Sequence, residues 1–138
     1  EKTLLGHRFP PGQHAAEAAL RFLADRPATH RHLAIRLARH FLADEPAPAD
    51  IRAIEGALRD TGGDLGAAAG VVISLRAAWD PPLTKFRRPA DHVLAATRAV
   101  GLPAARADLV LGGLFALGQG LWNAPQPDGW SDLRAAWQ

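Results

Sequence analysis

Glycine and proline divide this sequence at helix-sized intervals, and between them apolar residues recur every three or four positions. That spacing places apolar side chains on one face of an α-helix. The pattern is strongest in residues 27–43, which open with Pro27, a residue suited to the first helical turn. Its apolar face is formed by His30, Leu33, Ala34, Leu37, Ala38 and Phe41. We expect this face to point into the interior of a helical domain.

The same spacing predicts further helices along the chain. They span residues 14–25, 50–60, 64–79, 89–100 and 104–117, with a short last helix capped by Ser131. Asp64 is placed to cap the helix that follows Gly62-Gly63. Segment 104–117 is the most apolar and is expected to be central and buried, whereas residues 6–12 are interpreted as an irregular entry without a strand. Because alanine is abundant and β-branched residues are scarce, we predict an all-α bundle of six to seven helices, with a Pro/Trp-rich loop near the C-terminus.

Length and termini set the expected organisation. The chain has 138 residues and no repeat or low-complexity linker, so residues 1–138 are predicted to form one domain with one core. Residue 1 is Glu and the sequence contains no Met, so we expect a processed or excised piece of a larger protein. The longest uncharged apolar run, residues 109–122, is shorter than the roughly 20 residues that cross a bilayer. No membrane span is therefore predicted.

The charge balance does not indicate a nucleic-acid partner. The net charge is +2 although the isoelectric point is about 9.9, because almost all the cations are arginines. Residues 51–60 and 64–79 resemble a helix-turn-helix in length, but the second helix begins with Leu, Gly, Ala and Val side chains that cannot read a base edge. We therefore predict no nucleic-acid binding.

Residues for covalent catalysis or metal binding are scarce. The chain has no Cys and no Tyr, and its serines are Ser74, within a helix, and Ser131, at a helix cap. His32 and His40 lie about 12 Å apart along one helix, too far to bind one ion. His30 falls on the apolar face and is predicted to be a hydrogen-bonded core histidine. No catalytic residue, metal or cofactor is predicted, and an enzymatic role is not favoured for this chain alone.

Two basic clusters are candidates for an anion or partner patch. The first follows one side of the helix at 27–43 and the second precedes the helix at 89–100. They consist of His32, Arg36, Arg39 and His40, and of Lys85, Arg87 and Arg88. Guanidinium groups suit phosphate and carboxylate partners. The alternative interpretation, which we favour, is a solvated helix face whose arginine stems cover apolar surface.

The segment at 117–130 is the best candidate for a ligand site. Trp122 and Trp130, with Gln119, Asn123 and Asp128, could form an aromatic platform for a sugar or a peptide. The alternative interpretation, which we favour, is that both tryptophans fix a Pro-rich loop onto the bundle.

Several stretches together resemble a known bacterial family. They are residues 26–46, residues 60–65 with the following helix, residues 85–89, and the loop from Gly118-Gln119 to Gly129-Trp130. The chain resembles, over nearly its whole length, the C-terminal part of the bacterial domain-of-unknown-function family DUF1800. Arg26 stands where the family usually has His before Pro-Ala-Thr, and Arg36 where it often has Lys.

The resemblance implies a part of a larger exported bacterial protein, periplasmic or extracytoplasmic, often encoded beside a second protein of the phosphatase–sulfatase type. It implies no activity, cofactor or catalytic residue. Two functions follow from the residues and the resemblance together. The favoured one is a helical structural or interaction domain that packs against the rest of its polypeptide or a protein partner. The alternative is an accessory domain that binds an extracytoplasmic polymer such as a glycan through the tryptophan loop.

Overall fold

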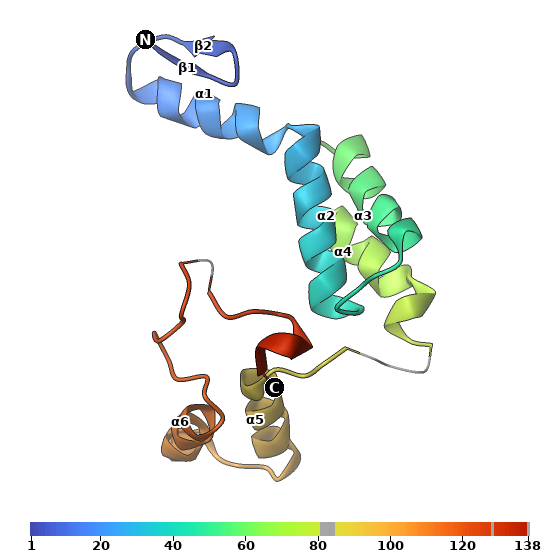
Figure 1. The fold of residues 1–138 in the computed structure, drawn as a ribbon, viewed down its shortest axis with the longest axis vertical. Helices are drawn as coiled ribbons and strands as arrows, with labels where there is room; N and C mark the ends of the chain where they lie inside the picture. Colours follow the sequence, from blue (N-terminus) through green and yellow to red (C-terminus); the bar gives the residue numbers. More distant parts are fainter. Residues whose placement is uncertain (81–84, 128, 138) are drawn as a thin grey trace. The chain divides into compact units, whose positions relative to one another are not determined.

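The computed structural model describes residues 1–80, 85–127 and 129–137. Figure 1 shows a succession of helices preceded by a short hairpin, which confirms the helical fold class. The chain divides into two compact units, Glu1–Thr84 and Lys85–Gln138. The single domain expected from the sequence stays a prediction.

The first residues form a β-hairpin, although no strand was predicted there. Strand β1 (Lys2–Leu4) pairs antiparallel with β2 (His7–Phe9). Leu5 and Gly6 connect the strands with φ values of 49° and 79°. Positive φ at both central residues is the geometry of a tight hairpin turn, for which Asn-Gly or Asp-Gly is the usual sequence signal. Leu-Gly between three-residue strands carries no such signal, which is why the prediction was wrong.

Four helices and one 3₁₀ turn complete the first unit. They are α1 (Gln13–Ala24), α2 (Pro27–Phe41), α3 (Pro48–Asp60), α4 (Leu65–Ser74) and the turn η1 (Arg76–Ala78). The predicted cap of α4 is confirmed, because the Asp64 carboxylate accepts hydrogen bonds from the backbone N–H groups of Gly66, at 2.7 Å, and Ala67, at 3.2 Å. These bonds satisfy N–H groups that have no partner inside the helix.

The core of the first unit lies where α2, α3 and α4 pack together (Figure 1). Its buried apolar residues are Ala34, Ala38, Leu42, Ile54, Leu58, Ala68 and Val72. Leu33 and Leu37 pack against this cluster, as predicted. Alanine at the contact positions lets the helix backbones approach closely, and the larger volume comes from Ile54 and Leu58 of α3.

The predicted burial of Phe41 is wrong, since 56% of this residue is exposed. The buried row of α2 moves in steps of four, through His30, Ala34 and Ala38 to Leu42. Each such step rotates the row by about 40° around the helix axis. At the end of α2 the row has therefore passed Phe41, and Leu42 takes the inward position.

Helix α4 also ends earlier than predicted, at Ser74 instead of Trp79. Leu75 leaves the helical conformation with a ψ of 134°. The indole of Trp79, which is mostly exposed, donates a hydrogen bond to the carbonyl oxygen of Ile73 at 2.6 Å. This bond satisfies one of the carbonyls left open where the helix ends. Residues 81–82, expected to stop the helix, lie outside the described residues.

The second unit contains α5 (Pro89–Ala99), η2 (Ala104–Arg106), α6 (Ala107–Ala116) and η3 (Arg134–Trp137). Helices α5 and α6 pack against each other, with Pro89, Val93 and Leu114 buried. The expectation that α6 is a buried central helix is wrong. Leu114 is its buried residue, while large apolar side chains around it are exposed, namely Leu109, Leu111 and Phe115. Among the described residues, no helix is both long and apolar enough to cross a membrane.

Candidate functional site

A shallow hollow of about 270 Å³ lies beside the start of α5 and the end of α6. We call it the tryptophan hollow; it is lined by Ala90, Leu114, Gln119, Gly120, Leu121, Trp122 and Trp130. The structure thus brings together Gln119, Trp122 and Trp130, three of the residues suggested by the sequence. Asn123 is exposed and lies outside this lining, and Asp128 lies outside the described residues.

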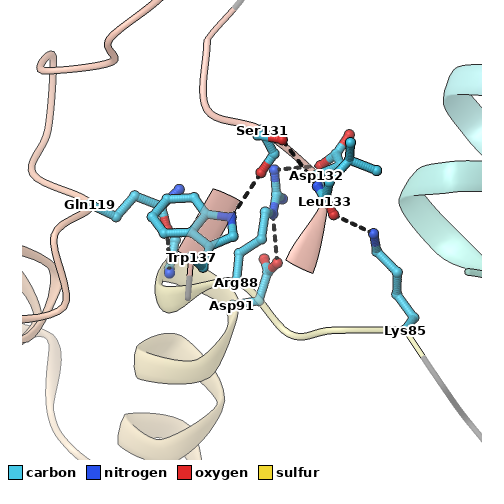
Figure 2. A network of polar contacts seen from close by, with 9 residues as sticks. Lys85, Arg88, Asp91, Gln119, Ser131, Asp132, Leu133 and Trp137 are labelled. Carbon is cyan, nitrogen blue, oxygen red and sulfur yellow. Dashed lines mark hydrogen bonds and ion pairs between the residues drawn. The ribbon is translucent and has the colours of Figure 1, made fainter. Parts of the chain in front are cut away.

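Gln119 is buried and caps helix α5 from a distant position in the sequence. Its side-chain carbonyl oxygen accepts a hydrogen bond from the backbone N–H of Ala90 at 2.7 Å (Figure 2). Ala90 is in the first turn of α5, where N–H groups have no partner within the helix. The backbone N–H of Gln119 also donates to the carbonyl of Leu114 at 2.8 Å. Gln119 therefore joins the end of α6 to the start of α5.

Trp122 combines full exposure with an uncommon backbone conformation. Its relative exposure is 101% and its φ is 60°. A bulky residue rarely adopts positive φ, because the Cβ atom then crowds the backbone. Strained residues of this kind concentrate at binding and catalytic sites. The conformation places a large indole at the edge of the tryptophan hollow instead of burying it.

Arg88 attaches the C-terminal segment, residues 129–137, to the start of α5. Its guanidinium contacts the carboxylate of Asp91 at 3.0 Å and that of Asp132 at 2.9 Å. Lys85 donates a hydrogen bond to the backbone carbonyl of Asp132. Figure 2 shows Lys85 and Arg88 reaching Asp132 from the chain that precedes α5. The side chains of Arg88 and Asp132 are only 20% and 11% exposed, so this ion pair is protected from water.

The C-terminal segment also holds itself together around Trp137. The Trp137 indole donates to the carbonyl of Ser131 at 3.0 Å, and the Ser131 hydroxyl accepts from the N–H of Leu133 at 3.1 Å. Ser131 therefore satisfies a backbone donor just before η3, close to its predicted capping role. The rings of Trp130 and Trp137 lie 5.4 Å apart between centroids. Trp130 reaches the tryptophan hollow from this packed arrangement.

The comparisons with known proteins identify a family. The family described as "Protein of unknown function (DUF1800)" matches residues 1–138. The chain belongs to the DUF1800 family. No curated protein and no solved structure matches. One stretch that carries the DUF1800 resemblance, the loop from Gly118 to Trp130, supplies most of the described lining of the tryptophan hollow. Arg88, in the stretch 85–89, pairs with Asp132, which follows this loop in the sequence.

The basic residues predicted as an anion patch lie in different environments in this DUF1800 chain. Lys85 and Arg88 contact Asp132 inside the second unit, which favours a structural role over anion binding, whereas Arg87 is exposed. On α2, three of the four predicted residues are exposed: His32, Arg36 and Arg39. His40 is half-buried, and its ring lies 4.6 Å from that of Phe41. The anion patch stays a hypothesis.

His30 is buried in the DUF1800 core, as predicted, with 5% of the residue exposed. The predicted hydrogen bond is not found at one ring nitrogen: Nε2 has no partner in the part of the chain that is described. A Cβ atom built on Gly63 would lie 3.6 Å from this nitrogen, so His30 faces the turn between α3 and α4. Across the described residues, no three His, Asp or Glu side chains gather in a way that could hold a metal ion.

Proposed function

We propose that this DUF1800 chain is a helical interaction domain. Its tryptophan hollow and the adjoining face of α6 bind apolar side chains of a protein partner, in another part of the same polypeptide or in a separate protein. The observation that carries the proposal is the chemistry of the hollow. Its described lining is mostly apolar: the polar side-chain groups are the indole N–H groups of Trp122 and Trp130 and the amide of Gln119, whose carbonyl oxygen is already used by Ala90. Such a site favours an apolar ligand over one recognised through many hydrogen bonds.

Exposed apolar side chains of α6 lie near this hollow, since a Cβ atom built on Gly120, in the lining, would lie 3.8 Å from the ring of Phe115. Leu111 and Phe115 are one helical turn apart and therefore lie on the same side of α6, and they are 48% and 81% exposed. Leu117 and Leu121 follow in the loop and are also exposed. Single exposed apolar residues are common, but a group of them beside a hollow is typical of a protein-binding surface.

The glycan alternative is supported by one observation, the fully exposed indole of Trp122. A sugar site also requires polar groups that converge on the hydroxyls. Gln119 offers only its amide nitrogen, and Asn123 lies outside the hollow. The interaction domain therefore remains the better supported proposal.

Site-directed photo-crosslinking tests the interaction domain. A photoreactive amino acid at Phe115, in the native full-length protein in its own cell, should link to one reproducible peptide, which is then synthesised and titrated against the purified chain. We expect Phe115→Ser and Leu111→Ser to weaken this binding about tenfold or more, since buried apolar anchors dominate interface energies. Ile73→Ser, a change at an exposed apolar residue of α4, serves as the matched control. Equal affinity for all variants would refute the proposal.

Titration with soluble cello- and chito-oligosaccharides tests the alternative function. Tryptophan fluorescence should remain unchanged if the chain is an interaction domain. A saturable change that Trp122→Ala abolishes, together with no effect of Phe115→Ser on any peptide, would replace the interaction domain with a glycan-binding one.

A further inference from the structure

We infer that the ion pair between Arg88 and Asp132 is a latch, which fastens the C-terminal segment to the start of α5 and thereby positions Trp130 in the tryptophan hollow. The latch concerns the second unit alone, while its effect on binding rests on the proposed function. Three observations carry the inference. Two polar contacts from the chain before α5 meet on Asp132, none of the described residues of the segment is buried, and bonds inside the segment tie Trp130 to its neighbours.

Asp132 is held both by its side chain and by its backbone. Arg88 contacts its carboxylate at 2.9 Å, and Lys85 donates a hydrogen bond to its backbone carbonyl (Figure 2). Arg88 is itself anchored, because it is the N-cap residue of α5 and its carbonyl accepts the N–H of His92 at 2.9 Å. Both side chains of the ion pair are mostly buried. A charge pair shielded from water is stronger than one on the surface, since the local dielectric constant is lower.

Apolar burial holds this segment less firmly than it holds the helices. None of the described residues 129–137 is buried, and Leu133, the largest aliphatic residue among them, is 38% exposed. In the helices of the same unit, by contrast, Val93 and Leu114 are buried. Burial of apolar surface is the main favourable term that holds a fold together. Because the segment buries so little, the contacts of Asp132 are its main attachment.

A segment attached in this way should open as a local event. Without the carboxylate of Asp132, the mostly buried guanidinium of Arg88 keeps its contact with Asp91, whose side chain is 49% exposed, but loses its better shielded partner. A buried charge that loses its partner is costly. Regions with little buried apolar surface open at a lower free energy than the core, and a released short segment does not stay helical by itself. The segment should therefore detach while α5 and α6 remain folded.

Contacts inside the segment pass its attachment on to Trp130. The Trp137 indole donates to the carbonyl of Ser131, and the rings of Trp130 and Trp137 lie 5.4 Å apart. Trp130 therefore moves with the segment, and it is also part of the lining of the tryptophan hollow. Gln119, in the same lining, is bonded to Ala90, a contact that does not involve the segment. The hollow thus has a part that belongs to the helices and a part, Trp130, that the latch holds in place.

Amide hydrogen exchange of the complete chain tests the latch. Asp132→Asn removes the charge with little change in shape, and it should speed exchange at Leu133 and Ala136 about tenfold or more, since hydrogen bonds to charged groups are the stronger ones. Both amides donate hydrogen bonds within the segment. The amides of Ala90 and Gln119, which report the helix side of the hollow, should exchange as in the native chain.

Two results would overturn the latch. One is unchanged exchange at the two amides of the segment. The other is equal acceleration at the two helix-side amides, because the substitution would then loosen the whole unit. Asp108→Asn is the matched control: its carboxylate pairs with Arg106 at 3.1 Å in the same unit, but both side chains are mostly exposed. This control should leave exchange in the segment within about twofold, since exposed ion pairs contribute little.

A second variant tests whether Arg88 and Asp132 act as one pair. Arg88→Met keeps an apolar stem but removes the guanidinium, so it should speed exchange at the same two amides of the segment. Arg88→Met combined with Asp132→Asn should exchange no faster than the faster single variant, because both substitutions break one contact. Additive effects would show that the two residues act through different contacts, which would overturn the latch.

The effect on binding is measured with the partner peptide found by crosslinking at Phe115. Trp130→Ala should weaken binding about tenfold, since aromatic anchors dominate such contacts, and Asp132→Asn should weaken it by a smaller factor. The double variant should bind no more weakly than Trp130→Ala, because Asp132 acts through Trp130. Additive losses would overturn this positioning role.

Failure of the latch and failure of the proposed function are distinguishable. Native affinity in both variants, together with the expected exchange, would support the latch but remove the tryptophan hollow from the proposed function. If no partner peptide is found, the proposed function fails, and the exchange measurements still decide whether the latch exists.

Discussion

At the scale of single residues, Gly112 and Gly113 are neighbours in α6 but meet different surroundings. A Cβ atom at Gly113 would lie 3.2 Å from both methyl groups of Val93, whereas one at Gly112 meets nothing within 4 Å. Glycine inside a helix costs roughly 0.5–1 kcal/mol relative to alanine. We expect Gly112→Ala to raise the free energy of unfolding by about this amount. Gly113→Ala should gain less or destabilise, because Val93 must shift. Chemical denaturation of both variants measures the difference, and equal gains would contradict the close packing of α5 on α6.

Arg106 lowers the pKa of Asp108 at the start of α6. Its guanidinium donates to both carboxylate oxygens, at 3.1 and 3.2 Å, and this hydrogen bonding is the main reason why the pKa of Asp108 is lowered. A carboxyl group whose pKa is lower in the folded state stabilises the fold above its unfolded pKa. That stabilisation is lost as the pH falls through the folded pKa. Arg106→Ala should return the pKa of Asp108 toward its ordinary value in a carboxyl-carbon NMR titration. An unchanged titration would show that Arg106 does not hold the carboxylate.

Individual side-chain roles were predicted only where local spacing determines them. The cap by Asp64 follows from its position between Gly63 and an apolar run, so the sequence sufficed. Gln119 was selected as a ligand residue, but its carbonyl oxygen caps α5. The bond joins residues 29 positions apart, a distance at which no local pattern indicates the partner. The same limit applies to Arg88 and Asp132, whose contact depends on how the C-terminal segment returns to α5.

At the scale of elements, the turn between β1 and β2 is a place where one substitution should stabilise the hairpin. Leu5 has a φ of 49°, which an ordinary side chain adopts at a cost, and it is 69% exposed. Asparagine tolerates this conformation and favours the same turn. Leu5→Asn should therefore stabilise the pairing of β1 with β2 by about 1 kcal/mol. Amide hydrogen exchange at Leu4 and His7, which face each other beside the turn and form its hydrogen-bonded pair, measures this change.

A control at the next position makes the hairpin prediction specific. Gly6→Ala places a Cβ atom at a φ of 79° and should speed exchange at the same amides. Faster exchange in Leu5→Asn would show that the leucine side chain contributes packing that outweighs its backbone strain.

The helices were predicted more reliably than the strands, for a physical reason. Apolar residues at every third or fourth position defined α2 and α3 almost to their ends, because the pattern extends over three or more turns. Pro27 also marked the start of α2, whereas α3 begins at Pro48, two residues before the predicted start at Asp50. The hairpin offers three residues per strand, too few for an alternating pattern. The early end of α4 depends on Leu75 and on the bond from Trp79 to Ile73, which periodicity cannot reveal.

At the scale of the whole molecule, burial depends on which helices meet. Helix α6 is among the most apolar elements, yet within its unit it packs on α5 and buries mainly Leu114. Helix α3, with charged residues on its outer side, provides Ile54 and Leu58, the largest fully buried side chains of the described residues. A small compact unit buries a smaller fraction of its surface. The apolar content of the segments therefore predicted a helical fold correctly, but it wrongly placed α6 in the core.

The contrast between Ile54 and Phe115 tests this distribution directly. Ile54 is fully buried between α2, α3 and α4, and Phe115 is 81% exposed on α6. Ile54→Ala removes atoms from a packed interior and should lower the free energy of unfolding by about 2–5 kcal/mol. Phe115→Ala should change it by less than about 0.5 kcal/mol, because its side chain is already in water. If Phe115→Ala proved as costly as Ile54→Ala in chemical denaturation, the phenylalanine would belong to a core, and α6 could not offer it to a partner. A small effect on stability, combined with weaker partner binding, is the outcome required of an interaction surface.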